Sequence, residues 1–252
     1  YTESSKLQRL PFVFTFYGID YENIVINTNG WISFGEFAMY SFRNYPIPGA
    51  GGPSPMVAAF WDDLKITSSG NVFYNEDFEN LGGVVEKIII QWDNMRTFDN
   101  GSYETFQMIL YNKELFSPTS TGDSELKIQY LDFNNTSNGY YPSGGTPTHG
   151  CYSTVGIESH LGDMGLEYTF NNSYPEAAAT LQDGSAIFIT TRFESSYILG
   201  DYNGDGELDV LDIVELVNAV LSGGYSEPGD MNQDGTLDVL DVVALVVAIL
   251  NP

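Results

Sequence analysis

Oxygen-bearing side chains recur at a fixed spacing in two stretches near the C-terminal end of this chain. The stretches are DYNGDGELDVLDIVELVNAVL at 201–221 and DMNQDGTLDVLDVVALVVAIL at 230–250, and fourteen of their 21 aligned positions are identical. A hard cation such as Ca2+ takes about six to eight oxygen ligands, and a twelve-residue loop supplies them from positions 1, 3, 5, 7, 9 and 12. The spacing therefore predicts two calcium-binding loops.

The loop pattern assigns a ligand to each of these positions. In the first loop the predicted ligands are Asp201, Asn203, Asp205, the main-chain carbonyl of Glu207, Asp209 and Asp212. In the second loop they are Asp230, Asn232, Asp234, the carbonyl of Thr236, Asp238 and Asp241. Position 6 must turn sharply and is glycine in both loops, whereas position 12 is Asp where an EF-hand usually has a bidentate Glu. Each loop must therefore close further to chelate through the shorter side chain.

Each loop leads directly into one predicted helix, at 210–221 and at 239–250. The residues SGGYSEPG before the second loop are rich in helix breakers, so no helix precedes it. Two such loop–helix units, 29 residues apart, resemble a dockerin module of type I-like pattern over Gly200–Pro252. For one isolated loop the alternatives are a single calcium-binding loop that only stabilises a surface turn, or an Asp/Asn/Gly turn that binds no metal.

The dockerin resemblance implies two bound Ca2+ and docking to a cohesin, which attaches the parent protein to a scaffold or cell surface. It also implies that positions 10 and 11 of each loop help to select the partner; here they are Val210, Leu211, Val239 and Leu240. Many dockerins carry a Ser–Thr pair at these positions. The apolar pairs of this chain leave the cohesin type open.

The two predicted helices differ on one face. Glu215 and Asn218 of the first helix are replaced by Ala244 and Val247 in the second, which is apolar almost all round. Such a helix is normally buried. We expect the face formed by Ala244, Val247 and Ala248 to cover a cohesin or the preceding domain; exposed small apolar surface is the alternative.

The charge of the chain excludes several classes of partner. The formal net charge is −25, and residues 201–241 hold eleven carboxylates and no Lys or Arg. Such a chain repels phosphate backbones and anionic membranes, so nucleic acid is not an expected partner. No apolar run reaches the length of a transmembrane helix, and YTESSKLQRL lacks a signal-peptide core. We expect a secreted or cell-surface protein that has lost its signal or is a piece of a longer chain.

Residues 1–195 are predicted to form an antiparallel β-sandwich, followed at 196–252 by the small all-α calcium-binding domain. Short apolar or alternating runs recur between turn residues, and Asn29–Gly30 predicts a tight hairpin. The expected strands are 12–17, 23–26, 31–34, 56–61, 71–74, 84–92, 105–111, 126–133, 152–157, 166–170 and 186–191.

An ordered set of short motifs in this region is similar to the nidogen-like extracellular β-domain. The motifs are VINTNGWISFG, MVAAFWDDL, NVFYNE, KIIIQWDNM, FQMILY and VGIES, spread over Phe12–Thr191. Such domains are usually adhesive or spacer modules without catalytic apparatus. The resemblance therefore implies a binding or structural role.

Three further sites carry weaker signals. Asp62–Asp63 at a strand end can hold a cation, although a hydrogen-bonded turn is the simpler interpretation. The rings of Tyr140–Tyr141 could bind a sugar by stacking on its apolar face; the alternative is that they pack against their own loop and stabilise it. His149 and Cys151 make a poor transition-metal signature, and Cys151, as the single cysteine, forms no intrachain disulfide.

Catalytic motifs such as GxSxG, HExxH, CxxC and the P-loop are absent from the sequence, so we expect no enzyme. The leading hypothesis is a non-catalytic adhesion or spacer module anchored by its dockerin. The alternative is a calcium-stabilised tail that packs on its own sandwich, the sandwich being a carbohydrate-binding module or an accessory domain of a secreted hydrolase.

Overall fold

The fold is mainly β, with two helices near the C-terminal end. The computed structural model describes residues 4–36, 39, 41–49, 51–78, 83–98, 101–137, 152–192 and 198–250. The chain divides into two compact units, Tyr1–Arg192 and Phe193–Pro252. The first unit carries the strands and the second unit carries both α-helices.

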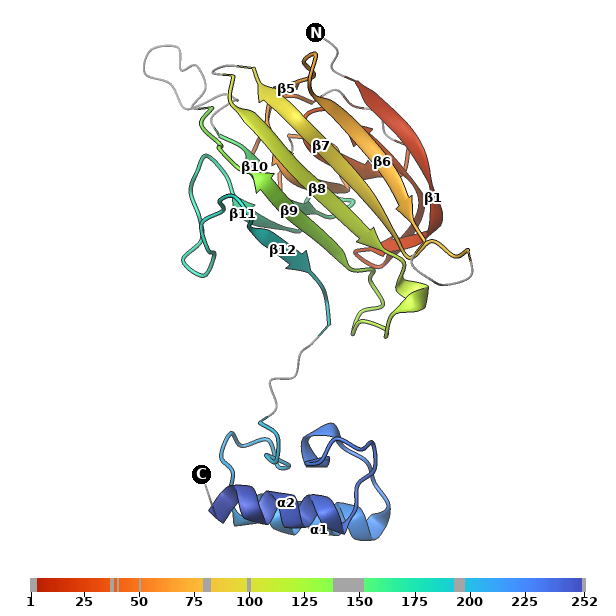
Figure 1. The fold of residues 1–252 in the computed structure, drawn as a ribbon, viewed down its shortest axis with the longest axis vertical. Coiled ribbons are helices and arrows are strands. Elements are labelled where there is room, and N and C mark those ends of the chain that lie inside the picture. Colours follow the sequence, from red (N-terminus) through yellow and green to blue (C-terminus); the bar gives the residue numbers. More distant parts are fainter. Residues whose placement is uncertain are drawn as a thin grey trace. The chain divides into compact units, whose positions relative to one another are not determined.

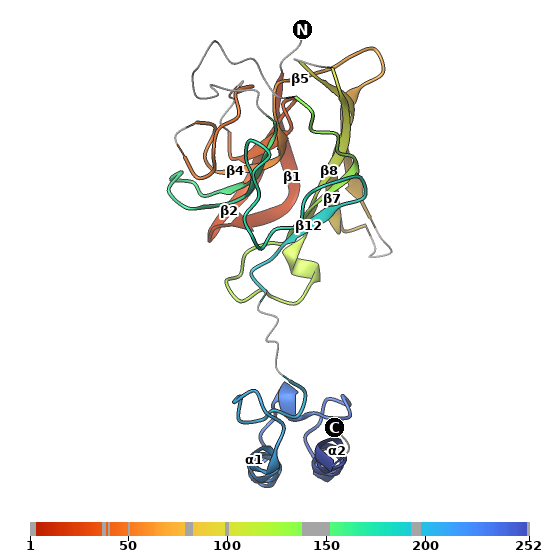
Figure 2. The same ribbon diagram turned by 90° about the vertical axis from the view of Figure 1, so that its left-hand side faces the viewer.

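Two antiparallel sheets form the first unit and face each other as two layers (Figure 2). The first sheet has the order β1-β2-β3-β4-β10-β11, and its strands are β1 (Ser5–Phe16), β2 (Ile19–Asn27), β3 (Trp31–Phe34), β4 (Met56–Trp61), β10 (Thr154–Glu158) and β11 (Gly165–Thr169). The second sheet has the order β12-β9-β8-β7-β5, with β6 also paired to β7 (Figure 1). Its strands are β5 (Leu64–Lys65), β6 (Asn71–Asp77), β7 (Lys87–Thr97), β8 (Tyr103–Tyr111), β9 (Leu126–Asp132) and β12 (Ala186–Ile189). The predicted β-sandwich is therefore confirmed at the level of two antiparallel sheets.

The central strand β4 is buried along its whole length, which explains its uninterrupted apolar sequence. Val57, Ala59 and Phe60 belong to the core between the sheets. Met56, Ala58 and Trp61 belong to a second cluster, with Trp31, Ile47 and the partly buried Tyr45. A strand covered on both faces needs apolar side chains at successive positions instead of alternation.

The hairpin predicted at Asn29–Gly30 is present as the turn between β2 and β3. Gly30 has φ +80°, and a Cβ at this position would lie 1.9 Å from the carbonyl oxygen of Phe60. Glycine is therefore required both for the backbone conformation and for the close approach of β4.

Sequence patterns located most strands but missed several parts of the sheets. The short strand β5, the first half of β1, the start of β2 and the ends of β6 and β7 were not predicted. The first half of β1 is largely exposed and lacks regular alternation, and Pro11 lies where the register with β2 shifts. Proline is tolerated in a strand at such irregular positions because it cannot donate to the ladder.

A buried carboxylate joins two loops at one end of the sandwich. Glu104 is fully buried and accepts hydrogen bonds from the Ser102 hydroxyl at 2.7 Å and from the backbone N–H groups of Asn134 and Asn135 at 2.8 and 3.2 Å. Burial raises the pKa of the Glu104 carboxyl to about 7, although these donors favour the charged form. The folded state therefore keeps this carboxyl protonated to a higher pH than the unfolded chain does.

The raised pKa of Glu104 predicts that the sandwich loses stability as the pH rises from about 4.5 to about 7. Within this window the folded state binds more protons than the unfolded state, so the free energy of unfolding falls with pH, by up to roughly 3 kcal/mol. Thermal melting of Glu104→Gln between pH 4.5 and 8 should show a flatter dependence than the parent. Glu22→Gln, at an exposed site, should leave the slope unchanged; an unaltered slope in Glu104→Gln contradicts the prediction.

Candidate metal centre

Each half of the second unit consists of a loop followed by one helix. The helices are α1 (Val210–Ser222) and α2 (Val239–Leu250), and the single-turn 3-10 helix η2 (Glu227–Gly229) precedes the second loop. The two α-helices contact each other, and both loops lie on the same side of the helix pair (Figures 1 and 2). The second unit is therefore built from two copies of the predicted loop–helix pattern.

Asp201, at position 1 of the first loop, holds the loop closed through its carboxylate. Oδ1 accepts from the backbone N–H groups of Gly204 and Asp205 at 2.8 and 3.1 Å, and Oδ2 accepts from Gly206 N–H at 2.9 Å. Gly206 has φ +88°, the left-handed conformation that the loop pattern predicted at position 6. The first predicted ligand is thus placed inside the turn that it organises.

Asp212, at position 12, connects the first turn of α1 back to the start of the loop. Its Oδ1 accepts from the backbone N–H groups of Tyr202 and Asn203 at 2.9 and 3.2 Å, and its Oδ2 accepts from Asp209 N–H at 2.9 Å. Asp209 in turn caps the helix by accepting from Leu211 N–H. Positions 9 and 12 are therefore joined to each other and to the backbone at positions 2 and 3.

The second loop repeats this network with an offset of 29 residues. Asp230 accepts from the backbone N–H groups of Asp234 and Gly235, and Asp241 accepts from those of Asn232 and Asp238. In both loops the side-chain amide at position 3 donates to the carboxylate at position 5, at 2.9 Å. The duplicated sequence thus produces a duplicated geometry.

Four carboxylates of these loops are buried in a segment that contains no cationic side chain. Asp201 and Asp230 are 6% and 4% exposed, and Asp212 and Asp241 are 0% exposed. No Lys, Arg or His occurs after Arg192. Buried carboxylates are costly unless they are paired or coordinate a metal, because burial removes their hydration.

The donors present fit a hard divalent cation by type and by hydrogen-bonding capacity. A carboxylate has about four lone-pair sites. The hydrogen bonds described above occupy three sites on Asp201 and on Asp212, so each retains an acceptor site for a cation. Among the residues that the structure describes, no three or more His, Cys, Asp or Glu side chains are grouped as a metal centre. A cation site in either loop would therefore need all the predicted ligands of that loop, including the Asn side chain and the main-chain carbonyl.

The two repeats interlock through glycines that precede the loops, a feature that the sequence analysis missed. A Cβ on Gly200 would lie 2.7 Å from Leu245 Cδ1 of α2, and a Cβ on Gly229 would lie 2.9 Å from Leu216 Cδ1 of α1. Leu216 and Leu245 are both fully buried. The start of each loop thus packs on the helix of the other repeat; the recurrence of glycine immediately before position 1 was the available signal.

The predicted partner-binding residues lie mostly on exposed surface. Val210, Leu211, Val239, Leu240 and Val247 are each more than half exposed, whereas Ala244 is intermediate. Val214 and Val243, at matching places on the two helices, extend the exposed apolar surface. Both helices therefore present an apolar stripe within the described part of the second unit.

The weaker site predictions in the sandwich have different outcomes. Asp62 lies buried at the end of β4, and its Oδ1 accepts from Asp63 N–H at 2.8 Å, as expected for a strand-terminating turn. Tyr140–Tyr141, His149 and Cys151 lie outside the described residues. Their predicted roles stay predictions.

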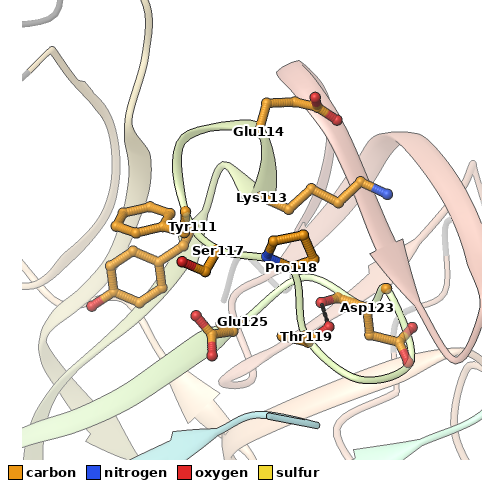
Figure 3. A pocket seen from close by; sticks show the side chains of 10 residues that line it. Tyr111, Lys113, Glu114, Ser117, Pro118, Thr119, Asp123 and Glu125 are labelled. Carbon is orange, nitrogen blue, oxygen red and sulfur yellow. Dashed lines mark hydrogen bonds between the residues drawn. The ribbon is translucent and has the colours of Figure 1, made fainter. Parts of the chain in front are cut away.

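A pocket of about 220 Å3 lies at the connection between β8 and β9, which contains the 3-10 helix η1 (Lys113–Leu115) (Figure 3). Its polar groups bind one another and neighbouring segments: Thr119 donates to the Asp123 carbonyl, Lys113 donates to Thr15 of β1, and Glu125 accepts at 3.0 Å from Arg192, which follows β12. The hydrogen bonds from Arg192 hold the pKa of the Glu125 carboxyl below its usual range. The contact between Glu125 and Arg192 ties the segment that follows β12 to the start of β9.

These features define a modular, mainly β protein with a duplicated acidic loop–helix unit. The profile of the NIDO-related family matches residues 2–191, and the chain belongs to this family. The nidogen-like resemblance is thereby confirmed, whereas no dockerin family profile matches the second unit. No curated protein and no solved structure matches the chain. No helix in the described ranges is long and apolar enough to cross a membrane.

The interlocked packing predicts that Gly229→Ala destabilises the second unit by about 1–3 kcal/mol, because the added methyl overpacks the contact with Leu216. Gly224→Ala is the matched control, since its Cβ would meet no atom closer than 3.8 Å. Thermal melting followed by far-UV circular dichroism measures both variants. Equal melting of Gly229→Ala and Gly224→Ala contradicts the interlocked packing.

Proposed function

We propose that this protein is a non-catalytic, secreted module whose C-terminal unit binds two Ca2+ and docks to a cohesin. The docked unit holds the NIDO-related sandwich on a scaffold or cell surface, where it serves in adhesion or as a spacer. One observation carries the proposal: two matched loops bury four carboxylates in a segment without any cationic side chain.

Calcium is the cation that the donor set favours. All proposed ligands are oxygens, which hard cations prefer, and the set lacks the sulfur and imidazole ligands typical of zinc. When bound, the ion would neutralise the carboxylates at positions 1, 5, 9 and 12 and fix the start of each helix. Binding and folding of the second unit would therefore be coupled.

The exposed stripes of α1 and α2 are the proposed docking surface. Leu211, Val214 and Leu221 follow one another along α1, and Leu240, Val243, Val247 and Leu250 follow along α2; all are more than half exposed. Exposed contiguous apolar surface of this kind marks interaction sites. A cohesin is the partner that the resemblance to dockerins suggests.

An extracellular setting and the lack of catalysis complete the proposal. Membership of the NIDO-related family is compatible with an extracellular location and brings no reaction with it. Extracellular modules bind calcium with a Kd of about 0.1–1 mM, so loops of ordinary affinity suffice there.

Calorimetric titration of the chelated protein should show two calcium sites, and chelation should remove helical far-UV signal. Asp212→Asn should weaken the first site at least tenfold, because it removes a buried charge from the ligand set. Glu215→Gln changes an exposed carboxylate on the same helix and should bind both ions normally. Uptake of no calcium, or helicity unaffected by chelation, would refute the metal site.

Capture of the calcium-loaded protein on a panel of immobilised cohesins tests docking. Val247→Glu should reduce capture at least tenfold while both calcium ions stay bound, because a charge would be buried at an apolar contact. Asn218→Glu alters the matching position of α1, which is already polar, and should change capture less than twofold. Capture that persists in EDTA, or no capture by any cohesin, counts against the proposal.

A further inference from the structure

The outer face of the second sheet carries a row of three glutamines, one on each of three neighbouring strands. Gln91 on β7 is directly opposite Gln107 on β8, which is opposite Gln129 on β9. Gln129 donates to Gln107 and Gln107 donates to Gln91, each through Nε2 to Oε1 at 2.6 Å. The three side-chain amides are thus locked in one orientation.

Hydrogen-bonding capacity remains along this row. A side-chain amide has two N–H donors and two acceptor lone pairs. Gln107 uses one donor and one lone pair on its neighbours, and no further partner of its amide occurs among the described residues. Each strand therefore presents a donor and an acceptor at a spacing of about 4.8 Å across the sheet.

The row lies in a groove and ends in an exposed aromatic ring. A groove of about 390 Å3 is lined by the three glutamines together with Lys127, Leu131 and Ser185. Phe73 on β6 is directly opposite Gln91 and is 50% exposed, which places its ring at one end of the row. At the other end of the row, Ala186 on β12 is opposite Gln129. Its side chain is a single methyl group, so it does not rise far above the sheet. Together with Phe73 and Ala186, the glutamine row spans five neighbouring strands, a distance of about 19 Å.

We propose that this groove binds a neutral polysaccharide chain, with Gln107 and its two neighbours bonding sugar hydroxyls and Phe73 stacking on the C–H face of a ring. A hydroxyl donates and accepts, so it complements an amide that presents both functions. Extended polymers repeat such hydroxyls at intervals, as the strands repeat the amides. The net charge of −25 disfavours anionic polymers, and the row itself contains no charged residue. This site is independent of the calcium loops.

The polar lining of the groove, which includes Lys127, and the hydrogen bond from Gln91 to Asp93 also distinguish it from the apolar docking surface proposed for the second unit. A protein partner would need a larger apolar centre than the groove supplies, since interface cores are depleted of polar side chains relative to their rims. Amide side chains fixed by their neighbours lose little conformational entropy on binding, which favours a hydroxyl-rich ligand of modest contact area.

Affinity electrophoresis of the full calcium-loaded chain in gels containing soluble xyloglucan, mixed-linkage β-glucan or galactomannan tests the site, with polygalacturonate as the anionic comparison. At least one neutral polymer should retard the protein, and Gln107→Ala should weaken retardation at least tenfold. Phe73→Ala leaves the glutamine row intact and should also weaken retardation by the neutral polymer. This second variant tests the site even if Gln107→Ala fails to fold. Glu22→Gln, at an exposed site on the other sheet, should behave as the parent.

Three results would overturn the proposal. The first is that no neutral polymer retards the protein. The second is retardation that survives both Gln107→Ala and Phe73→Ala in folded protein, since this would place any glycan site elsewhere. The third is stronger retardation by polygalacturonate than by every neutral polymer.

Discussion

Uncompensated negative charge is the constraint on which the second unit depends. Asp201, Asp212, Asp230 and Asp241 are buried among backbone N–H groups, and the chain offers no cationic side chain beyond Arg192. Backbone donors orient these carboxylates but carry only partial charges, so they cannot neutralise four full ones. The divalent cation that we propose for each loop would supply this charge, and the proposed function starts from that requirement.

The duplication makes the two loops mutually dependent. Gly200 packs on Leu245 of the second repeat, and Gly229 packs on Leu216 of the first, so neither loop can open without disturbing the core beneath the other. A unit of this size buries only a small apolar core, so its packing leaves a narrow margin of stability. The two proposed ion sites would share this core and would therefore stabilise it together.

The sandwich achieves its stability differently, through a large apolar core closed by buried polar contacts. Strand β4 is covered on both faces, while Glu104 bonds loop backbone at one end of the sheets. This rigid scaffold fixes the strand register, and the register aligns Gln91, Gln107 and Gln129 in a single row. The proposed glycan-binding surface thus depends on pairing between strands and on no loop motif.

The sequence by itself determined the two repeated loops, both helices and most strands, because these depend on local spacing of polar, apolar and turn residues. Helix α2 and strands β3 and β4 have the predicted bounds. Only the tertiary structure decided the glutamine row, the burial of Glu104 and the packing of Gly229 on Leu216. Each of these brings together residues far apart in the chain, and no local pattern records which strands become neighbours or which glycine meets which leucine.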